Sequence, residues 1–256
     1  MLDDLVAGAL ADAEDRRALR PLDLVEAAAH AAPPALDALA ALAPAPRVKI
    51  IAEVKRASPS RGALAEIADP ASLAVSYETG GASAVSVLTE GRRFKGSLDD
   101  LDEVRAAISI PVLRKDFIAN PYQVFEARAA GADLVLLIVA ALEQSRLSEL
   151  HELVTGLGMT ALVETHSAEE VERALDVGAA LVGVNARDLS TFELDQDLFG
   201  RLADSIPAGV VRVAESAVKN AADVAHYRSA GADVVLVGEA LVTSDPVRTL
   251  SEFLAV

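Results

Sequence analysis

The sequence predicts an α/β fold, and within that class a (β/α)8 TIM barrel, because strand-like and helix-like segments alternate eight times along 256 residues. Four segments repeat one pattern, a glycine, a short polar step and a buried strand, and they begin at Gly81, Gly131, Gly178 and Gly231. Their spacings of 50, 47 and 53 residues are too long for one βα unit and fit two. The remaining four strands are expected near residues 49–56, 110–117, 159–165 and 210–217.

Helical segments are expected between these strands, over residues 99–107, 121–130, 143–156, 168–177 and 220–230. Strict alternation of this kind implies parallel strands joined by right-handed crossovers. An open doubly wound sheet is the alternative. It is disfavoured because no Gly-x-Gly-x-x-Gly turn follows the first strand and because the repeat runs evenly to the C-terminus.

Residues 1–256 are predicted to form a single barrel domain, of which residues 1–47 are an N-terminal helical extension. Residues 2–19 show helical apolar spacing, and a second helical stretch ends at Pro33-Pro34. Two placements of this extension are open. It either closes the lower end of the barrel or lies as a lid near the mouth where the strands end.

The composition limits the class of function. The chain is 52% hydrophobic and 24% charged, which is typical of a globular protein. Its 23 basic and 39 acidic residues give a net charge of −16, so neither nucleic acid nor an anionic membrane is expected as a partner and a cytoplasmic location is favoured. The chain has no cysteine, and its four histidines lack metal-site spacing, so no metal site is predicted.

Polar and charged residues stand where the predicted strands end, and this feature points to catalysis. They are Glu53, Lys55, Ser58, Lys115, Glu164, Asn185, Arg187, Glu215 and Ser216. In a parallel barrel, catalytic groups come from the C-terminal ends of several strands. Structural ion pairs would explain any one of these residues. The whole set is costly to bury without a function, so the sequence predicts an enzyme.

The loops after the seventh and eighth strands predict a phosphate site, as in many phosphosugar barrels. Residues 215–217 end the seventh strand and residues 237–239 end the eighth. Gly238 would let the backbone approach an anion, Ser216 adds a hydroxyl, and Ser58 would close the cradle from the first loop. Three apolar residues are either core or the wall of an aromatic pocket; they are Phe94, Phe117 and Leu136.

Six motifs, in order on six predicted strands, closely resemble the indole-3-glycerol phosphate synthase family of tryptophan biosynthesis. They are residues 51–60 (IAEVKRASPS), 88–90 (LTE) with 94–97 (FKGS), 113–117 (LRKDF), 184–189 (VNARDL), 214–216 (AES) and 235–239 (VLVGE). The resemblance covers nearly the whole chain, including the N-terminal helices.

The resemblance implies a carbon–carbon lyase, of the carboxy-lyase kind, that needs no cofactor. Its phosphosugar substrate would be 1-(2-carboxyphenylamino)-1-deoxyribulose 5-phosphate, which closes a ring with loss of CO2 and water to give indole-3-glycerol phosphate. The resemblance gives Lys115 the role of general acid and assigns the dehydration step to Glu53, Lys55 and Glu164. It implies substrate contacts from Asn185, Arg187, Glu215, Phe94, Phe117 and Leu136, phosphate contacts from Ser58, Ser216, Ala217, Gly238 and Glu239, and partners among the tryptophan-pathway enzymes.

Two residues depart from the family pattern. Ala217 stands where many members have glycine, and it would be strained if the phosphate loop needs a positive φ there. Glu239 stands where some members have a serine that contacts phosphate, so its side chain is expected to turn away.

Two alternative functions are weaker. Another phosphosugar barrel, such as phosphoribosylanthranilate isomerase, usually needs a Cys/Asp pair that this chain lacks. A catalytically inactive barrel kept as a protein partner is disfavoured because no strand-end lysine or glutamate is lost.

Overall fold

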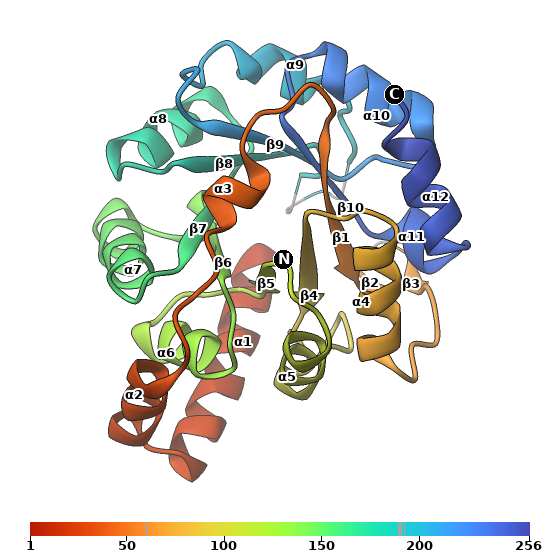
Figure 1. Cartoon of the computed structure of the whole chain (residues 1–256). Coiled ribbons are helices and arrows are strands. Elements are labelled where there is room, and N and C mark those ends of the chain that lie inside the picture. Colours follow the sequence, from red (N-terminus) through yellow and green to blue (C-terminus); the bar gives the residue numbers. More distant parts are fainter. Residues whose placement is uncertain (60, 189–190, 192) are drawn as a thin grey trace.

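The computed structural model describes residues 1–59, 61–188, 191 and 193–256, and it contains eight parallel strands closed into a barrel (Figure 1). The barrel strands are β1 (Lys49–Val54), β4 (Ala84–Leu88), β5 (Val112–Lys115), β6 (Leu134–Ile138), β7 (Thr160–Thr165), β8 (Leu181–Asn185), β9 (Val211–Glu215) and β10 (Val234–Val237). Each strand pairs with the next one in the chain, and β10 closes the ring against β1. The predicted TIM barrel is confirmed. Ser60 and Leu189, which end two of the family motifs, lie outside the described residues.

Helices surround the barrel and alternate with its strands (Figure 1). They are α4 (Pro70–Thr79), α5 (Leu98–Ala107), α6 (Pro121–Ala129), α7 (Gln144–Gly156), α8 (Ala168–Asp176), α9 (Leu198–Ala203), α10 (Ala221–Ser229), α11 (Glu239–Val242) and α12 (Pro246–Phe253). Capping boxes at Ser97, Asn120 and Asn220 fix where three of them begin, because side chain and backbone satisfy each other's free groups there. Over the part of the chain that is described, no helix is long and apolar enough to cross a membrane.

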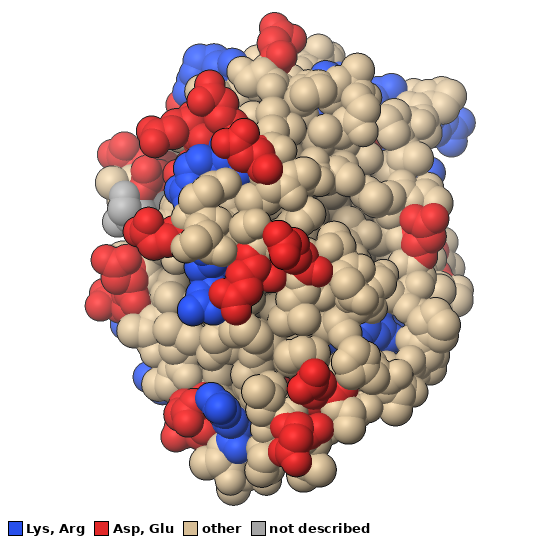
Figure 2. All heavy atoms as spheres, turned by 90° about the vertical axis from the view of Figure 1, so that its left-hand side faces the viewer, with Lys and Arg blue, Asp and Glu red and all other residues tan. Residues whose placement is uncertain are grey.

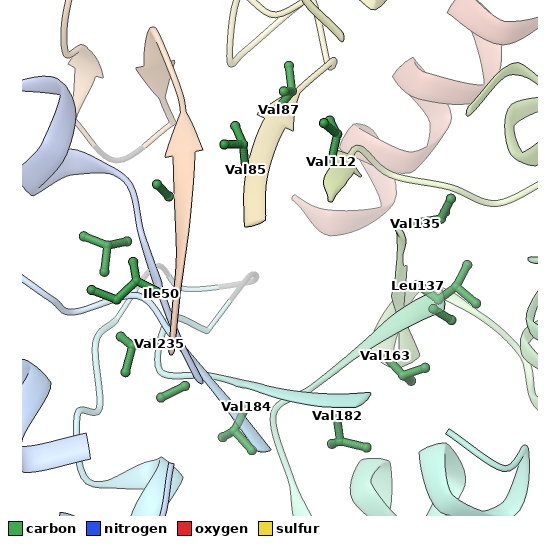
Figure 3. Packing of buried hydrophobic residues seen from close by; sticks show 14 of the residues in the cluster. Ile50, Val85, Val87, Val112, Val135, Leu137, Val163, Val182, Val184 and Val235 are labelled. Atoms are coloured by element: carbon green, nitrogen blue, oxygen red, sulfur yellow. The ribbon is translucent and has the colours of Figure 1, made fainter. Parts of the chain in front are cut away.

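Two apolar layers hold the barrel together. Successive strand residues point to opposite faces, so each buried strand supplies one residue to the interior and the next to the helices. The outer layer is rich in β-branched side chains, and Figure 3 labels ten residues of this layer, all but Leu137 β-branched. The inner layer includes Ile51, Leu113, Leu134 and Leu162. A cavity opens where polar residues end the strands.

The N-terminal extension reaches both ends of the barrel. Helix α1 (Leu2–Leu19) lies at the mouth, where its Asp12 forms an ion pair with Arg92 in the loop after β4. The extension continues through α2 (Leu22–Ala31) to the short helix α3 (Ala38–Leu42). Just before α3, the N–H of Leu36 donates to Asp133 at 2.8 Å, and Asp133 immediately precedes β6. Both placements that the sequence left open are therefore realised, by different helices.

The small hairpin of β2 (Ala57–Ser58) and β3 (Gly62–Ala63) lies in the long loop that follows β1. Arg56 opens this loop and forms an ion pair with Asp100 near the start of α5, which ties the loop to the barrel wall. The hairpin thereby brings Ser58 and its neighbours to the C-terminal ends of the strands.

Candidate active site

A cavity of about 330 Å³ opens at the C-terminal ends of the barrel strands. All fifteen residues that the sequence predicted for the site line this cavity: Glu53, Lys55, Ser58, Phe94, Lys115, Phe117, Leu136, Glu164, Asn185, Arg187, Glu215, Ser216, Ala217, Gly238 and Glu239. They come from segments far apart in the sequence. Closure of the barrel brings them to one rim because every parallel strand ends on the same side.

Lys115 lies between two carboxylates. Its Nζ atom is 3.4 Å from Oε2 of Glu164 and 3.4 Å from Oε2 of Glu215. Burial alone would lower the pKa of Lys115, but the charges of Glu164 and Glu215, with a smaller contribution from Glu53, outweigh burial and raise that pKa above its usual value. The ammonium group is therefore charged at neutral pH and can donate a hydrogen bond or a proton.

The two glutamates around Lys115 differ in their acidity. Burial would raise the pKa of Glu164, but the positive charges of Lys115 and His166 lower it below its ordinary value. Burial and the charge of Glu164 raise the pKa of Glu215 to about 8. Neither oxygen of Glu215 accepts a hydrogen bond of good geometry from the described residues. The site thus combines an ionised carboxylate with one that is protonated over much of the neutral range.

Glu53 and Lys55 form a second charged pair, with Oε2 and Nζ 2.6 Å apart. Gly238 lies against this pair, because a Cβ built on it would be 2.5 Å from Oε2 of Glu53 and 2.9 Å from Nζ of Lys55. Gly183 on β8 is equally restricted, since a Cβ there would collide with the carboxylate of Glu215. A larger residue at either position would displace the end of a charged side chain of the site.

The loop after β9 has an unusual backbone. Ser216 and Ala217 have φ angles of 70° and 59°, which is the left-handed region. A non-glycine residue there costs on the order of 1 kcal/mol. The strain that the sequence predicted for Ala217, conditional on a positive φ, therefore applies. Asn185 holds this loop in place, because its Oδ1 accepts hydrogen bonds from Oγ of Ser216 at 2.8 Å and from the N–H of Arg187 at 3.0 Å.

Arg61, in the loop after β1, also lines the cavity and was not predicted. Its Nε donates to Oε1 of Glu239 at 3.0 Å, and this hydrogen bond lowers the pKa of Glu239. The side chain of Glu239 is therefore held by Arg61. Together with Lys55 and Arg187, Arg61 gives the cavity the local positive charge that an acidic protein needs to bind an anion. On the outer face that Figure 2 presents, acidic side chains are more prominent than basic ones.

Apolar side chains enclose another part of the cavity. The rings of Phe94 and Phe117 lie 6.1 Å apart, and Leu136 belongs to the same lining. Further apolar lining residues that the sequence did not indicate are Leu5, Leu88, Ile138 and Leu194. Leu5 comes from α1, so no signal in the sequence could have found it while the position of that helix was open.

His166 is a second residue that the sequence missed. The sequence excluded it as a metal ligand, because the histidines lack metal-site spacing, and gave it no role in the site. In the structure it follows β7, and its Nε2 atom lies 3.6 Å from Oε1 of Glu164. Its proximity to Glu164 in the sequence, two residues away, was the available signal.

Comparisons with known proteins identify the chain's relatives. The family model described as indole-3-glycerol phosphate synthase matches residues 2–253. An indole-3-glycerol phosphate synthase from Leifsonia xyli subsp. xyli is 76% identical, covering 99% of this chain and 97% of the relative. One from Mycobacteroides abscessus is 62% identical, covering 96% and 90%. Among solved structures, thiamine phosphate pyrophosphorylase from Pyrococcus furiosus has a TM-score of 0.61 at 15% identity, covering 80% of this chain and 93% of that chain, which shows a shared fold alone.

Proposed function

Because the chain belongs to the indole-3-glycerol phosphate synthase family, we propose that its barrel mouth converts 1-(2-carboxyphenylamino)-1-deoxyribulose 5-phosphate to indole-3-glycerol phosphate. The activity is that of a carboxy-lyase of tryptophan biosynthesis. An anthranilate ring carbon bonds to the C2′ carbonyl carbon, and CO2 and water are then lost. The observation that carries the assignment is the 76% identity to a synthase over 99% of the chain.

In the first step, Lys115 is the general acid. An aryl carbon is a weak nucleophile, so the carbonyl oxygen that it attacks must be polarised or protonated. As the carbon–carbon bond forms, that oxygen becomes an alkoxide and takes a proton from the ammonium group of Lys115. The support for this role is the position of Lys115 between Glu164 and Glu215, which keeps it protonated until then. A general acid of this kind contributes about 10²–10⁴-fold in rate.

In the dehydration step, one group removes a proton while another protonates the departing hydroxyl. The Glu53–Lys55 pair and Glu164 take these roles in our proposal. The support is electrostatic, because Glu164 has a lowered pKa and is ionised, as a base must be. The 2.6 Å contact between Glu53 and Lys55 places a charged donor at the same cavity.

The rest of the lining positions the substrate. We place the aromatic ring against the apolar wall of Phe94, Phe117 and Leu136. Hydroxyl groups and the carboxylate would be oriented by Asn185, Arg187 and Glu215. The phosphate would bind at Ser58, Ser216, Gly238 and the backbone N–H groups of Ala217 and Glu239. The charges of Lys55, Arg61 and Arg187 support a site for an anion in this otherwise acidic protein.

Two further proposals concern the setting of the reaction. The net charge of −16 favours a cytoplasmic enzyme that does not bind nucleic acid. Partners among the tryptophan-pathway enzymes are proposed from the family's pathway alone.

The assignment is tested with the purified protein and the carboxyphenylamino-deoxyribulose phosphate, following the fluorescence of the indole product. The wild-type protein is expected to turn over, and Lys115→Ala to lower kcat by about 10²–10⁴-fold. Lys49→Ala is the matched control, because Lys49 begins β1 at the opposite end of the barrel. Absence of product from the wild-type protein, or undiminished product from Lys115→Ala, would contradict the proposal.

A further inference from the structure

His166 and Glu170 extend the charged cluster behind the cavity wall. His166 lies between the end of β7 and Ser167, which caps α8. Its side chain is 12% exposed, and it is not among the residues that line the cavity. Oε1 of Glu164 is 3.6 Å from Nε2, and Oε2 of Glu170 is 3.2 Å from Nδ1. The imidazole ring therefore stands between two carboxylates, one in the site and one outside it.

Glu170 determines which ring nitrogen carries hydrogen. Its Oε2 accepts the backbone N–H of His166 at 2.7 Å, so the carboxylate is fixed in place beside Nδ1. A carboxylate accepts but does not donate, so Nδ1 must carry the hydrogen. In a neutral imidazole, Nε2 would then present a lone pair to the negative oxygen of Glu164. Nε2 is buried and has no hydrogen-bond partner of good geometry among the described residues. Protonation of Nε2 turns this repulsion into a charge-assisted attraction.

The charges around the ring favour the protonated form. Glu164 on β7 and Glu170 on α8 contact it, and Glu215 on β9 adds a more distant negative charge. Lys115 contacts the other oxygen of Glu164. Its positive charge and the positive end of the α8 dipole both oppose protonation of the His166 ring. Burial also lowers the pKa of His166, but the hydrogen bond to Glu170 and the charge of Glu164 outweigh these effects and raise it.

We propose that His166, protonated on both ring nitrogens and anchored by Glu170, is a positioning residue that keeps Glu164 ionised and fixed in orientation. The inference rests on the proposed function, in which Glu164 acts in the dehydration step. Lys115 holds Oε2 of Glu164 and His166 holds Oε1, so the carboxylate cannot rotate without breaking one contact. His166 itself touches no substrate.

The first test is the pH dependence of kcat in His166→Gln, which keeps a neutral donor but no charge. Loss of the positive charge raises the pKa of Glu164, so the acidic limb of the kcat profile is expected to move up by roughly one pH unit. At the optimum, kcat should fall by on the order of 10-fold, as for a misplaced catalytic group, while KM is retained. His226→Gln is the matched control, because His226 pairs with Asp197 at 3.3 Å on the outside of the barrel. A His166→Gln profile that superimposes on the wild-type profile would overturn the proposal.

The second test reads the charge on the ring without an assay of activity. The imidazole nitrogen signals of the full-length protein are recorded by NMR as a function of pH, and the His166 signals are identified by their absence in His166→Gln. Both nitrogens are expected to be protonated at pH 7, and Glu170→Gln is expected to move the titration to lower pH. A neutral His166 at pH 7 would overturn the inference. A wild-type protein without turnover would instead overturn the proposed function, and the spectra would still decide the charge on His166.

Discussion

Strand β5 separates two groups of buried charged residues that differ in how completely their hydrogen bonds are made. Arg114 and Lys115 are neighbours on this strand, so their side chains point to opposite faces. Lys115 points into the mouth cluster, which we define as Glu53, Lys55, Lys115, Glu164 and Glu215. Arg114 points away from it into the outer network, which consists of Arg16, Thr89, Arg114, Asp116 and Glu126.

The outer network is saturated with hydrogen bonds. Arg114 is fully buried and donates to Oγ1 of Thr89 at 3.2 Å and to Oδ2 of Asp116 at 3.0 Å. Asp116 accepts a second bond from Thr89 at 2.7 Å. Glu126 accepts two bonds from Arg16 of α1, at 2.6 and 2.8 Å. The network therefore fixes β5 and ties the N-terminal helix to it.

The mouth cluster is left incomplete by comparison. Glu215 is equally buried, yet neither of its oxygens accepts a good hydrogen bond from the described residues. Lys115 is held at 3.4 Å by each of its two carboxylates, which is longer than the 3.0 Å contact between Arg114 and Asp116. Buried polar groups normally have hydrogen-bond partners. The missing hydrogen bonds of Glu215 and the long contacts of Lys115 therefore indicate that these groups are available to a ligand. The outer network thus has the saturation expected of a structural role, and the mouth cluster has the incompleteness expected of the proposed site.

Arg114→Met is expected to have the largest effect on stability, because it leaves Asp116 buried without its cation and leaves Glu126 with Arg16 alone. Loss of one partner of a buried ion pair costs about 3–5 kcal/mol in the free energy of unfolding. Urea denaturation measures this loss. Lys115→Met is the matched control on the adjacent residue, and its cost should be clearly smaller because Glu215, whose pKa is already raised to about 8, can hold a proton in place of the lost charge. Equal losses from the two variants would erase the distinction between the networks.

Glu215→Gln is expected to stabilise the protein at alkaline pH while lowering kcat. The pKa of Glu215 in the folded state is about 8, above that of an exposed glutamate, so the folded state favours the protonated form. This contribution to stability is present at low pH and is lost as the pH rises through 8. Glutamine mimics the protonated form at every pH. The melting temperature of the variant should therefore exceed that of the wild type at pH 8, by the equivalent of about 2 kcal/mol, and the difference should shrink at pH 5. A constant difference would refute the assignment of the raised pKa.

Ala217→Gly is expected to have the smallest effect, a gain of about 0.5 kcal/mol. Glycine relieves the strain of the positive φ, and the greater freedom of the unfolded glycine chain offsets part of the gain. Thermal unfolding measures the difference. Ala225→Gly is the control, because Ala225 lies in the interior of helix α10, where glycine should cost about 1 kcal/mol. If both variants lost stability alike, the loop at the mouth would not be strained.

The alternation of strands and helices was enough to predict the barrel and the residues at its mouth. Lys115 and Glu164 each end an apolar run, and barrel closure brings such ends together whatever their separation in the chain. Long-range contacts of loops and helices could not be predicted in this way. Arg61 meets Glu239, 178 residues away, and Leu5 depends on where α1 packs. His166 lies just beyond its strand, so the pattern that identified strand ends passed over it.

Gly183 and Gly238 carry no reactive group, yet they limit how the enzyme can evolve. Every single-base change that replaces a glycine adds at least a β-carbon. At these two positions that atom would meet the carboxylate of Glu215 or the Glu53–Lys55 pair. A substitution at either codon would therefore displace a charged group of the site, and a directed-evolution library aimed at new substrates should leave both codons unrandomised and vary the apolar wall instead.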